Sequence, residues 1–422
     1  MGTLLDKPET TKESKEEEGN GIQYGVCSMQ GGLAFWVPTV RTFKLTFPLS
    51  QSNEKPPGWR NTMEDAHCAK IGLNDQLKDW SFFAVFDGHA GEAVSKYCAD
   101  NLLDAILESE DFKKSIAAGS EAFGEEQIAL AKSGIKAGFL KLDKEMKELP
   151  ELVEKKDKSG STAVCCLVSP KHFFFINCGD SRAVLSREGK VLFSTNDHKP
   201  FNVAEKERIQ NAGGSVMLQR VNGSLAVSRA LGDYEYKQNE DKTDCEQLVS
   251  PEPEISVIER NNATDEFIVL ACDGIFDVIN NEDLCTYVRY LYEIKSAGLS
   301  SITFSILDTC LHKVSSPSHT VSSAGHRPLI FFFSPPQGSL DNMTVIVVSL
   351  PAAPQTDNKK VTLDDKLDQD IRYLIEGELA DLALRSLPRR DRLLIDSQFL
   401  ARRLLLRRRQ RVRGHFKSFG GA

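Results

Sequence analysis

The chain has 422 residues, of which 41% are hydrophobic and 27% charged, and its formal net charge is −8. Such a length can bury a large core, in one big domain or in one domain with appendages. The charge is uneven, because residues 385–422 contain 12 Lys and Arg against 2 Asp and Glu, which leaves −18 on the remainder. An acidic body argues against general nucleic-acid binding and suits divalent cations.

The ten cysteines include no C-x-x-C pair, and the polar N-terminus is unlike a secretory signal. We therefore expect reduced thiols in an intracellular protein, both cytoplasmic and nuclear. No apolar run approaches the roughly 18 residues of a membrane span, which predicts a soluble protein. Gly2 is a candidate for acylation and hence for membrane contact, although Asp6 stands where the myristoylation motif has Ser or Thr.

The N-terminal part of the chain begins with charged residues. Residues 1–20 predict a mobile segment, and a first strand is expected at Ile22–Gln30. Further along, Arg60 is followed four and five residues later by the acids Glu64 and Asp65. The planar fork of an arginine matches a phosphate, and acids can bind a metal ion through waters.

A buried strand is predicted by the apolar run Phe82–Phe86, which ends in Asp87, Gly88 and His89. A carboxylate at a strand end is held rigidly, as a metal ligand must be. Gly88 has no Cβ and therefore allows close backbone approach. The end of this strand is the first part of a candidate metal site.

Residues 90–150 have a helical period, with an amphipathic stretch at Glu125–Leu149. Short strands follow, and Asp180 comes directly after one of them. Strands in hairpins and helices in pairs predict antiparallel sheets covered by helices, an α+β fold, rather than a doubly wound one. The expected strands are Thr162–Val168, Phe173–Cys178 and a hairpin around Arg187–Lys190, and the expected helices are Glu205–Ala212, Glu282–Ile294 and Ser301–Lys313.

Two later strands repeat the arrangement of an acid at a strand edge. The run Phe267–Ala271 leads to Asp273, with Asp277 one turn beyond, and Asp341 stands just before the strand Met343–Val348. Hard carboxylate oxygens without Cys or clustered His select Mg²⁺ or Mn²⁺ over Zn²⁺. The sequence has neither a P-loop nor a nucleophile elbow. It therefore predicts an acidic, oxygen-only metal centre.

The last segment, residues 356–422, predicts a helical and basic tail in which Leu and Arg are interleaved. It fits a nuclear-import or anionic-surface element, or a basic amphipathic helix on a membrane. A disordered or frame-altered end without function is the alternative. The domain itself is expected over residues 21–355.

Short motifs occur in one order along the chain: Glu64-Asp65, Phe86–Gly91, Ser159–Ala163, Gly179–Arg182, Asn222–Asp233, Asp273-Gly274 and Asp341-Asn342. This ordered set resembles the metal-dependent Ser/Thr protein phosphatases of type 2C. The opening Met1–Pro8 and the segment Ser250–Glu254 are similar to the animal alpha/beta branch of that family. The resemblance covers residues 1–355, apart from two stretches that depart from the family pattern.

The resemblance implies a central β-sandwich of two antiparallel sheets flanked by α-helices on both sides, with two metal ions at one end. Asp87 would bridge two Mg²⁺ or Mn²⁺ ions, with the Gly88 carbonyl on one of them. The other implied ligands are Asp273 and Asp341 on the second ion, Glu64 and Asp65 mainly through waters, and Asp180 and Asp277 at a weaker third ion.

The same resemblance implies a mechanism without a phosphoenzyme. A water between the two cations, whose pKa they lower, would attack phosphorus in line. Arg60 would hold the phosphate oxygens, and His89 would protonate the leaving serine or threonine oxygen. The expected partners are phosphoserine and phosphothreonine proteins, nucleic acid is not required, and the expected state is a monomer.

Two stretches depart from the family pattern, residues 31–57 before Arg60 and residues 314–337 before Asp341. Both stretches fit introns that are retained in frame. The alternative is two surface loops, because each doubling of loop length adds little to the free-energy cost of closing a loop. Each lies next to a site element, where a displacement of about 1 Å can cost about 100-fold in rate. A catalytically impaired binding or adaptor protein with a phosphatase fold is therefore the alternative to an active enzyme.

Overall fold

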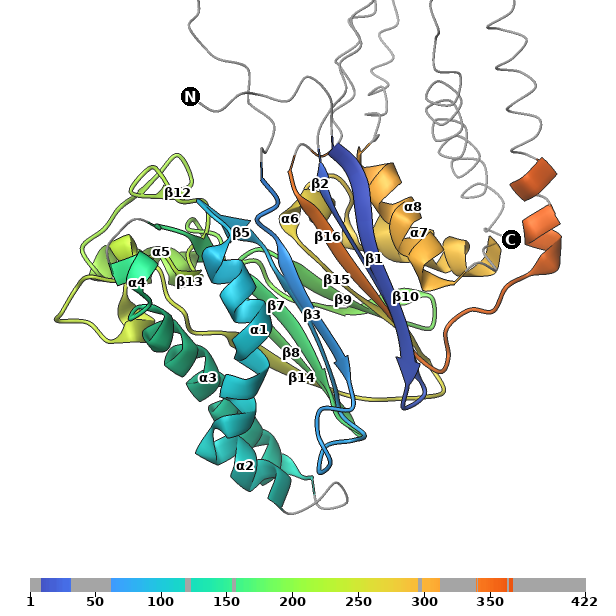
Figure 1. Cartoon of the computed structure of the whole chain (residues 1–422), viewed down its shortest axis with the longest axis horizontal. Coiled ribbons are helices and arrows are strands. Elements are labelled where there is room, and N and C mark those ends of the chain that lie inside the picture. Colours follow the sequence, from blue (N-terminus) through green and yellow to red (C-terminus); the bar gives the residue numbers. More distant parts are fainter. Residues whose placement is uncertain are drawn as a thin grey trace, which may run out of the picture.

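The computed structural model describes residues 9–31, 62–117, 123–153, 157–294, 298–311, 339, 341–362 and 364–366. In this part of the chain, two antiparallel sheets pack face to face between two groups of helices (Figure 1). The predicted α+β sandwich with helices on both sides is confirmed. Arg60, Gly2, most of each insertion and the basic end of the tail lie outside the described residues.

The larger sheet has six strands in the order β1-β2-β16-β15-β9-β10. Its two central strands, β15 and β16, are apolar runs and are almost completely buried, as expected for strands covered on both faces. The bounds are β1 (Glu9–Gly19), β2 (Ile22–Gly31), β9 (Arg182–Arg187), β10 (Lys190–Ser194), β15 (Asp265–Ala271) and β16 (Met343–Ser349).

The second sheet has five strands in the order β14-β8-β7-β4-β3. Its central strands β7 and β4 are buried along their whole length. The bounds are β3 (Ala66–Ile71), β4 (Ser81–Phe86), β7 (Ala163–Val168), β8 (His172–Cys178) and β14 (Glu254–Glu259). A separate three-stranded sheet, β13-β6-β5, consists of β5 (Gly88–His89), β6 (Gly160–Ser161) and β13 (Leu231–Gly232).

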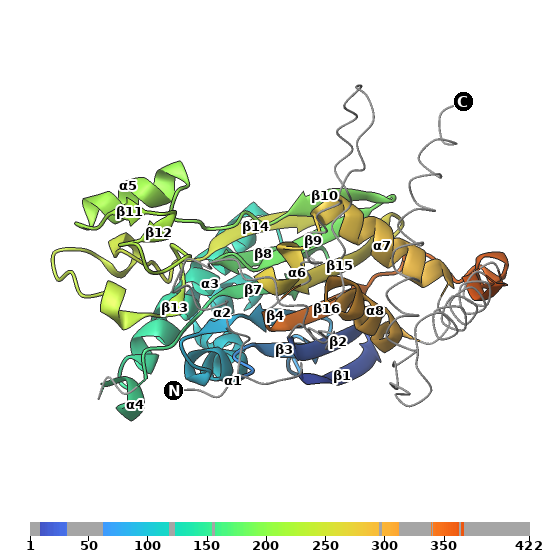
Figure 2. The same cartoon turned by 90° about the horizontal axis from the view of Figure 1, so that it is seen from above.

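The helices lie on opposite sides of the sandwich (Figures 1 and 2). One apolar cluster lies between the sheets, and two others join each sheet to its own helices. The helices of the five-stranded side are α1 (Ala93–Glu108), α2 (Glu110–Ala117) and α3 (Glu125–Met146), and those of the six-stranded side are α7 (Asn281–Ile294) and α8 (Leu299–Leu311). The remaining α-helices and β-strands are α4 (Pro150–Val153), α5 (Val203–Asn211), α6 (Asp273–Phe276), β11 (Val216–Met217) and β12 (Arg220–Val221).

The N-terminal boundary predicted at residue 20 is wrong. Glu9–Gly19 forms β1, which pairs antiparallel with β2 at the edge of the larger sheet. Backbone pairing requires no apolar side chains, and charged residues on an edge strand hinder pairing with a further chain. The strand is also held from the side, because Lys12 Nζ lies 2.6 Å from Asp308 Oδ1 on α8.

The domain also continues past its predicted end at residue 355. The backbone N–H of Asp357 donates to the carbonyl of Glu293 at 2.8 Å, and Lys360 Nζ lies 2.7 Å from Glu293 Oε2. The first residues after 355 therefore pack against α7.

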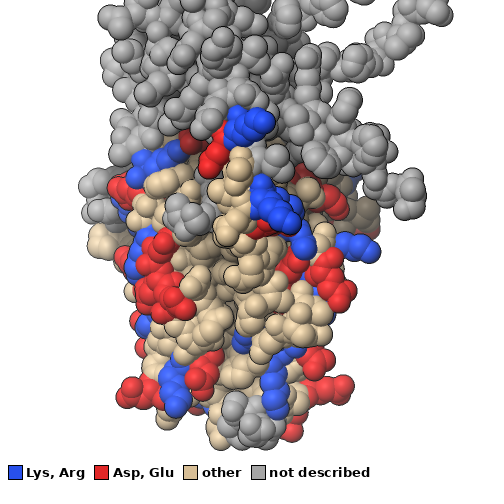
Figure 3. Space-filling view, turned by 90° about the vertical axis from the view of Figure 1, so that its right-hand side faces the viewer, with Lys and Arg blue, Asp and Glu red and all other residues tan. Residues whose placement is uncertain are grey.

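No helix among the described residues is long and apolar enough to cross a membrane. On the face shown in Figure 3, acidic and basic side chains are interspersed rather than segregated.

Candidate metal centre

Four strand ends meet at one end of the sandwich because their pairing is antiparallel. The end of β4 faces the start of β3, with Phe86 opposite Ala66. In the other sheet, the end of β15 faces the start of β16, with Ala271 opposite Val345. The acids that flank these strand ends are thereby collected at one place, and they are Asp65, Asp87, Asp273 and Asp341.

Both Asp-Gly motifs need their glycine because the backbone of another segment approaches closely. A Cβ on Gly88 would lie 2.2 Å from the carbonyl oxygen of Glu64, and one on Gly274 would lie 2.2 Å from that of Asn342. These distances are far below a normal contact, so only glycine fits. The two glycines therefore allow the segment of Asp87 to approach that of Asp65, and the segment of Asp273 to approach that of Asp341.

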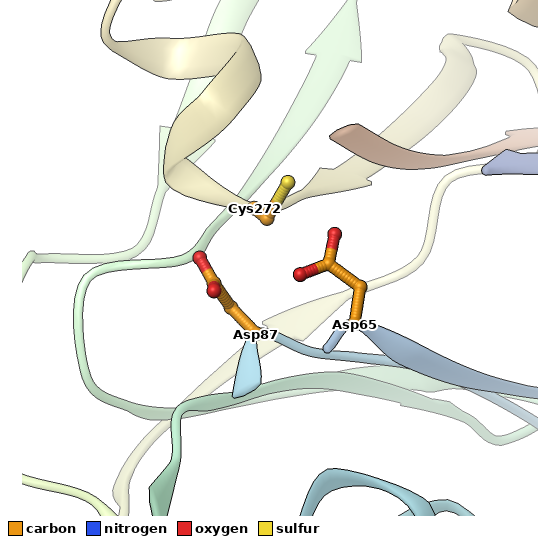
Figure 4. Close-up of side chains that lie close together, drawn as sticks. All are labelled: Asp65, Asp87 and Cys272. Carbon is orange, nitrogen blue, oxygen red and sulfur yellow. The ribbon is translucent and has the colours of Figure 1, made fainter. Parts of the chain in front are cut away.

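At the centre of the site, the side chains of Asp65, Asp87 and Cys272 lie close together, and the Asp65 carboxylate is turned toward Asp87 (Figure 4). The ligand atoms of these three side chains all lie within 4.8 Å of one another. Thr344 Oγ1 donates to Asp65 Oδ2 at 2.8 Å, which fixes that carboxylate. Two carboxylates so close together, in a partly buried place, are a suitable donor set for a hard divalent cation.

The electrostatics of the acids support this interpretation. Burial, followed by the charges of Asp273 and Asp65, raises the pKa of Asp87 well above its usual value. Burial and the charges of other acids, Asp180 first among them, likewise raise the pKa of Asp273. Carboxylates that repel each other in a buried place gain most from an external cation. The residues therefore fit Mg²⁺ or Mn²⁺.

Cys272 also lies in this cluster, which the sequence analysis did not anticipate. Burial, together with the charges of Asp65 and Asp87, raises the pKa of its thiol well above the usual value. Cys272 Sγ accepts the Thr344 N–H at 3.2 Å and donates to the Asn342 carbonyl at 3.5 Å. A neutral thiol held by the backbone is a poor ligand, since metal binding needs the thiolate. The oxygen donors still determine which ion fits.

A second group of acids lies beside the centre. Asp180 is buried and forms a salt bridge with Lys199. Burial and neighbouring acids raise the pKa of Asp277 despite the opposing charge of Lys199. Lys199 thus supplies a positive charge that the sequence analysis did not anticipate, next to the position implied for a third ion.

His89, from β5, lies near the same end of the sandwich. Its Nε2 is 2.7 Å from Asp233 Oδ2. Burial alone would lower the pKa of His89, but the charge of Asp233 and its hydrogen bond raise it on balance. In the sequence, Asp233 is only the last residue of the motif Asn222–Asp233, and no role was predicted for it.

Asn342 also has a role that the sequence analysis missed. Its Oδ1 accepts the backbone N–H of Glu64 at 2.8 Å, and its Nδ2 donates to the carbonyls of Gln30 at 2.8 Å and Thr62 at 3.2 Å. One amide therefore joins the end of β2, the segment before Asp65 and the start of β16. The motif of an acid followed by Asn before a strand was the only sequence signal for it.

Residues 51–317 match the protein-family model described as Protein phosphatase 2C. This match covers more than half of the chain. The chain belongs to the protein phosphatase 2C family. It is a metal-dependent protein serine/threonine phosphatase, in agreement with the acidic centre.

The relatives support the same assignment. The chain is 47% identical over 376 residues to protein phosphatase 1B of Homo sapiens, covering 89% of this chain and 67% of that protein. It is 46% identical to protein phosphatase 1A of Homo sapiens, covering 89% and 83%. A solved structure of a phosphatase from Toxoplasma gondii is 22% identical, with a TM-score of 0.56 over 81% of this chain and 96% of that one, and it shares the fold.

Proposed function

We propose that this chain removes phosphate from phosphoserine and phosphothreonine in proteins by direct attack of water, with two Mg²⁺ or Mn²⁺ ions held at the strand ends. The observation that carries this proposal is the cluster of carboxylates at the strand ends, where ligand atoms of Asp65 and Asp87 lie within 4.8 Å of each other. The proposed ligands are Asp87, the Gly88 carbonyl, Asp273 and Asp341, with Glu64 and Asp65 in the surrounding shell and Asp180 and Asp277 at a weaker third ion.

The chain's own residues would orient the metal ligands and donate the proton that the leaving group needs. Bound Mg²⁺ or Mn²⁺ would supply charge that stabilises the transferred phosphoryl group and lowers the pKa of water. Thr344 fixes Asp65, and Asn342 holds the backbone of Glu64. His89 would donate the proton that the leaving serine or threonine oxygen needs. Arg60 would bind the phosphate oxygens.

The edges of both insertions support an active enzyme over an impaired one. The backbone N–H of Ser339 donates to the carbonyl of Cys310 at 2.9 Å, so the chain meets across the second insertion. Across the first, the carbonyls of Gln30 and Thr62 both accept from the same amide, Asn342 Nδ2. The described residues that flank each insertion are therefore held close together, which supports an intact centre.

The test is hydrolysis of a phosphothreonine peptide by the full chain with Mn²⁺ and with EDTA. A chain lacking residues 31–57 and 314–337 serves as the matched comparison. We expect metal-dependent turnover in both chains, within about tenfold of each other. Turnover only in the shortened chain would establish the impaired alternative, and no turnover in either folded chain would overturn the proposal.

A further inference from the structure

His89 and Asp233 are brought together by the small sheet β13-β6-β5. Gly88 and His89 on β5 pair with Ser161 and Gly160 on β6, and the other side of β6 pairs with β13. Asp233 follows β13 directly. The two side chains come from positions 144 residues apart, and β6 between them sets their spacing.

The hydrogen bond between His89 and Asp233 depends on a glycine at position 160. A Cβ on Gly160 would lie 2.4 Å from Asp233 Oδ2 and 2.5 Å from His89 Nε2, so the absence of a side chain there allows the hydrogen bond. Asp233 has φ 53°, a left-handed conformation that costs energy in a residue other than glycine. Such a conformation persists only where the surroundings impose it.

A buried ion pair binds the backbone that precedes Asp233. Lys237 Nζ lies 2.8 Å from Asp143 Oδ1 on α3 and donates to the carbonyl of Ala230 at 2.9 Å. The same carboxylate accepts the backbone N–H of Gly232 at 2.8 Å. Asp143 and Lys237 are only 6% and 9% exposed, and a buried pair is better suited to fixing one geometry than to adding stability.

We propose that Asp233 is a positioning residue that orients the His89 imidazole for proton donation, and that the buried Asp143–Lys237 pair holds Asp233 in place. The inference rests on the proposed function, in which His89 is the general acid. Because Asp233 occupies Nε2, the proton passes from His89 Nδ1 to the leaving oxygen as its bond to phosphorus breaks. The imidazole then regains a proton from water.

The test uses the dependence on the leaving group. A serine or threonine oxygen needs a proton to leave, whereas p-nitrophenolate leaves without one. The full chain is assayed at saturating Mn²⁺ on a phosphothreonine peptide and on p-nitrophenyl phosphate. The variants are Asp233→Asn, His89→Gln, the double variant, and Lys237→Met. Glu235→Gln is the matched control, since it removes only an exposed pair with Lys158 in the same loop.

We expect Asp233→Asn to lower kcat on the peptide by about 10- to 100-fold and on p-nitrophenyl phosphate by less than about threefold. KM and the Mn²⁺ concentration for half-maximal activity should stay within about twofold of wild type, because no ligand is removed. The double variant should be no slower than His89→Gln, because the two residues act as a unit. Lys237→Met should give a smaller loss with the same selectivity, and Glu235→Gln should give none.

His89→Gln separates a failure of the proposed function from a failure of this inference. If His89→Gln slows both substrates equally, His89 is not the general acid and the proposed role of His89 is overturned. If His89→Gln is selective for the peptide but Asp233→Asn is not, or if the double variant multiplies the two losses, Asp233 does not position His89. Should Lys237→Met fail to fold, Asp233→Asn and the double variant still decide the outcome for Asp233. A folded Lys237→Met without the selective loss would overturn the role of the buried pair.

Discussion

Buried carboxylates occur in two regions of this molecule, and their environments are opposite. On α5, Glu205 accepts from Arg229 Nη2 at 2.7 Å, Arg208 Nη1 at 2.6 Å and Ser228 Oγ at 2.7 Å. Burial would raise the pKa of Glu205, but these partners lower it to about 2. At the metal centre, burial and neighbouring acids raise the pKa of Asp87 instead.

The difference separates a carboxylate that stabilises the fold from the carboxylates that we propose to serve the reaction. Where the chain supplies its own cations, as around Glu205, a buried charge favours the folded state. Where acids face acids, the folded state is less stable than it would be with neutral side chains, and an external cation is required. The following changes test this contrast, from the largest expected effect to the smallest.

Replacing the central acid should have the largest effect. Asp87→Asn removes one carboxylate from the cluster and should lower phosphothreonine-peptide hydrolysis by about 1,000-fold or more at saturating Mn²⁺, or about 4 kcal/mol in the barrier. Steady-state rates at several Mn²⁺ concentrations provide the measurement. A variant that retained more than a tenth of the wild-type rate would show that Asp87 is not a central ligand.

The paired carboxylate should control stability rather than activity. Glu205→Gln should lower the free energy of unfolding by about 3 kcal/mol at pH 7, because the pKa of Glu205 falls from 4.5 to about 2 on folding. This contribution is complete above pH 4.5 and is lost as the pH falls toward about 2. Urea unfolding at pH 7 and pH 4 should therefore show a smaller difference from wild type at the lower pH.

Glu207→Gln, on the exposed face of the same helix, is the control for that experiment. Its unfolding free energy should stay within about 0.5 kcal/mol of wild type. An equal loss in both variants, or a difference between Glu205→Gln and wild type that grows as the pH falls, would contradict the assignment.

A neutral substitution at the metal centre should have the opposite sign. Without metal, Asp273→Asn removes one of several like charges and should raise the free energy of unfolding by about 1 kcal/mol, or about 2 °C in Tm. Differential scanning calorimetry in EDTA provides the measurement. A lower Tm for Asp273→Asn would mean that the centre is not electrostatically strained in the absence of metal.

The smallest expected effect concerns Lys199, which forms a salt bridge with Asp180 beside the centre. Lys199→Met should lower the Mn²⁺ concentration for half-maximal activity by about threefold, because an ion near Asp180 no longer competes with the ammonium group. Lys206→Met on the exposed face of α5 is the control. A higher Mn²⁺ requirement in Lys199→Met alone would contradict this role.

The sequence predicted the parts of the fold whose side-chain pattern reflects burial. The apolar runs of β4, β15 and β16 were found because both faces of these strands are covered. In contrast, β1 has no apolar face, since its described residues from Lys12 to Glu18 are polar and almost all exposed. Backbone pairing with β2 determines its conformation, and no local sequence pattern records that pairing.

Part of the candidate site could also be predicted from the sequence. Asp87, Asp273 and Asp341 stand at strand ends, so the strand pattern and residue type together located them. Asp233 and Lys199 were missed because their partners, His89 and Asp180, are distant in sequence and meet only after the sheets form. The roles of Asn342 and Cys272 depend likewise on approach between strands, which a single sequence does not encode locally.

The most direct test of the account is the shift in Tm that Mn²⁺ produces in wild type, Asp87→Asn and Glu205→Gln, each compared with EDTA. A ligand that binds only the folded state raises Tm by mass action. The account predicts that Mn²⁺ raises the Tm of wild type and of Glu205→Gln by similar amounts, and that Asp87→Asn shows little or no rise. An equal rise in Asp87→Asn, or no rise in wild type, would contradict the claim that the acidic cluster is the metal centre.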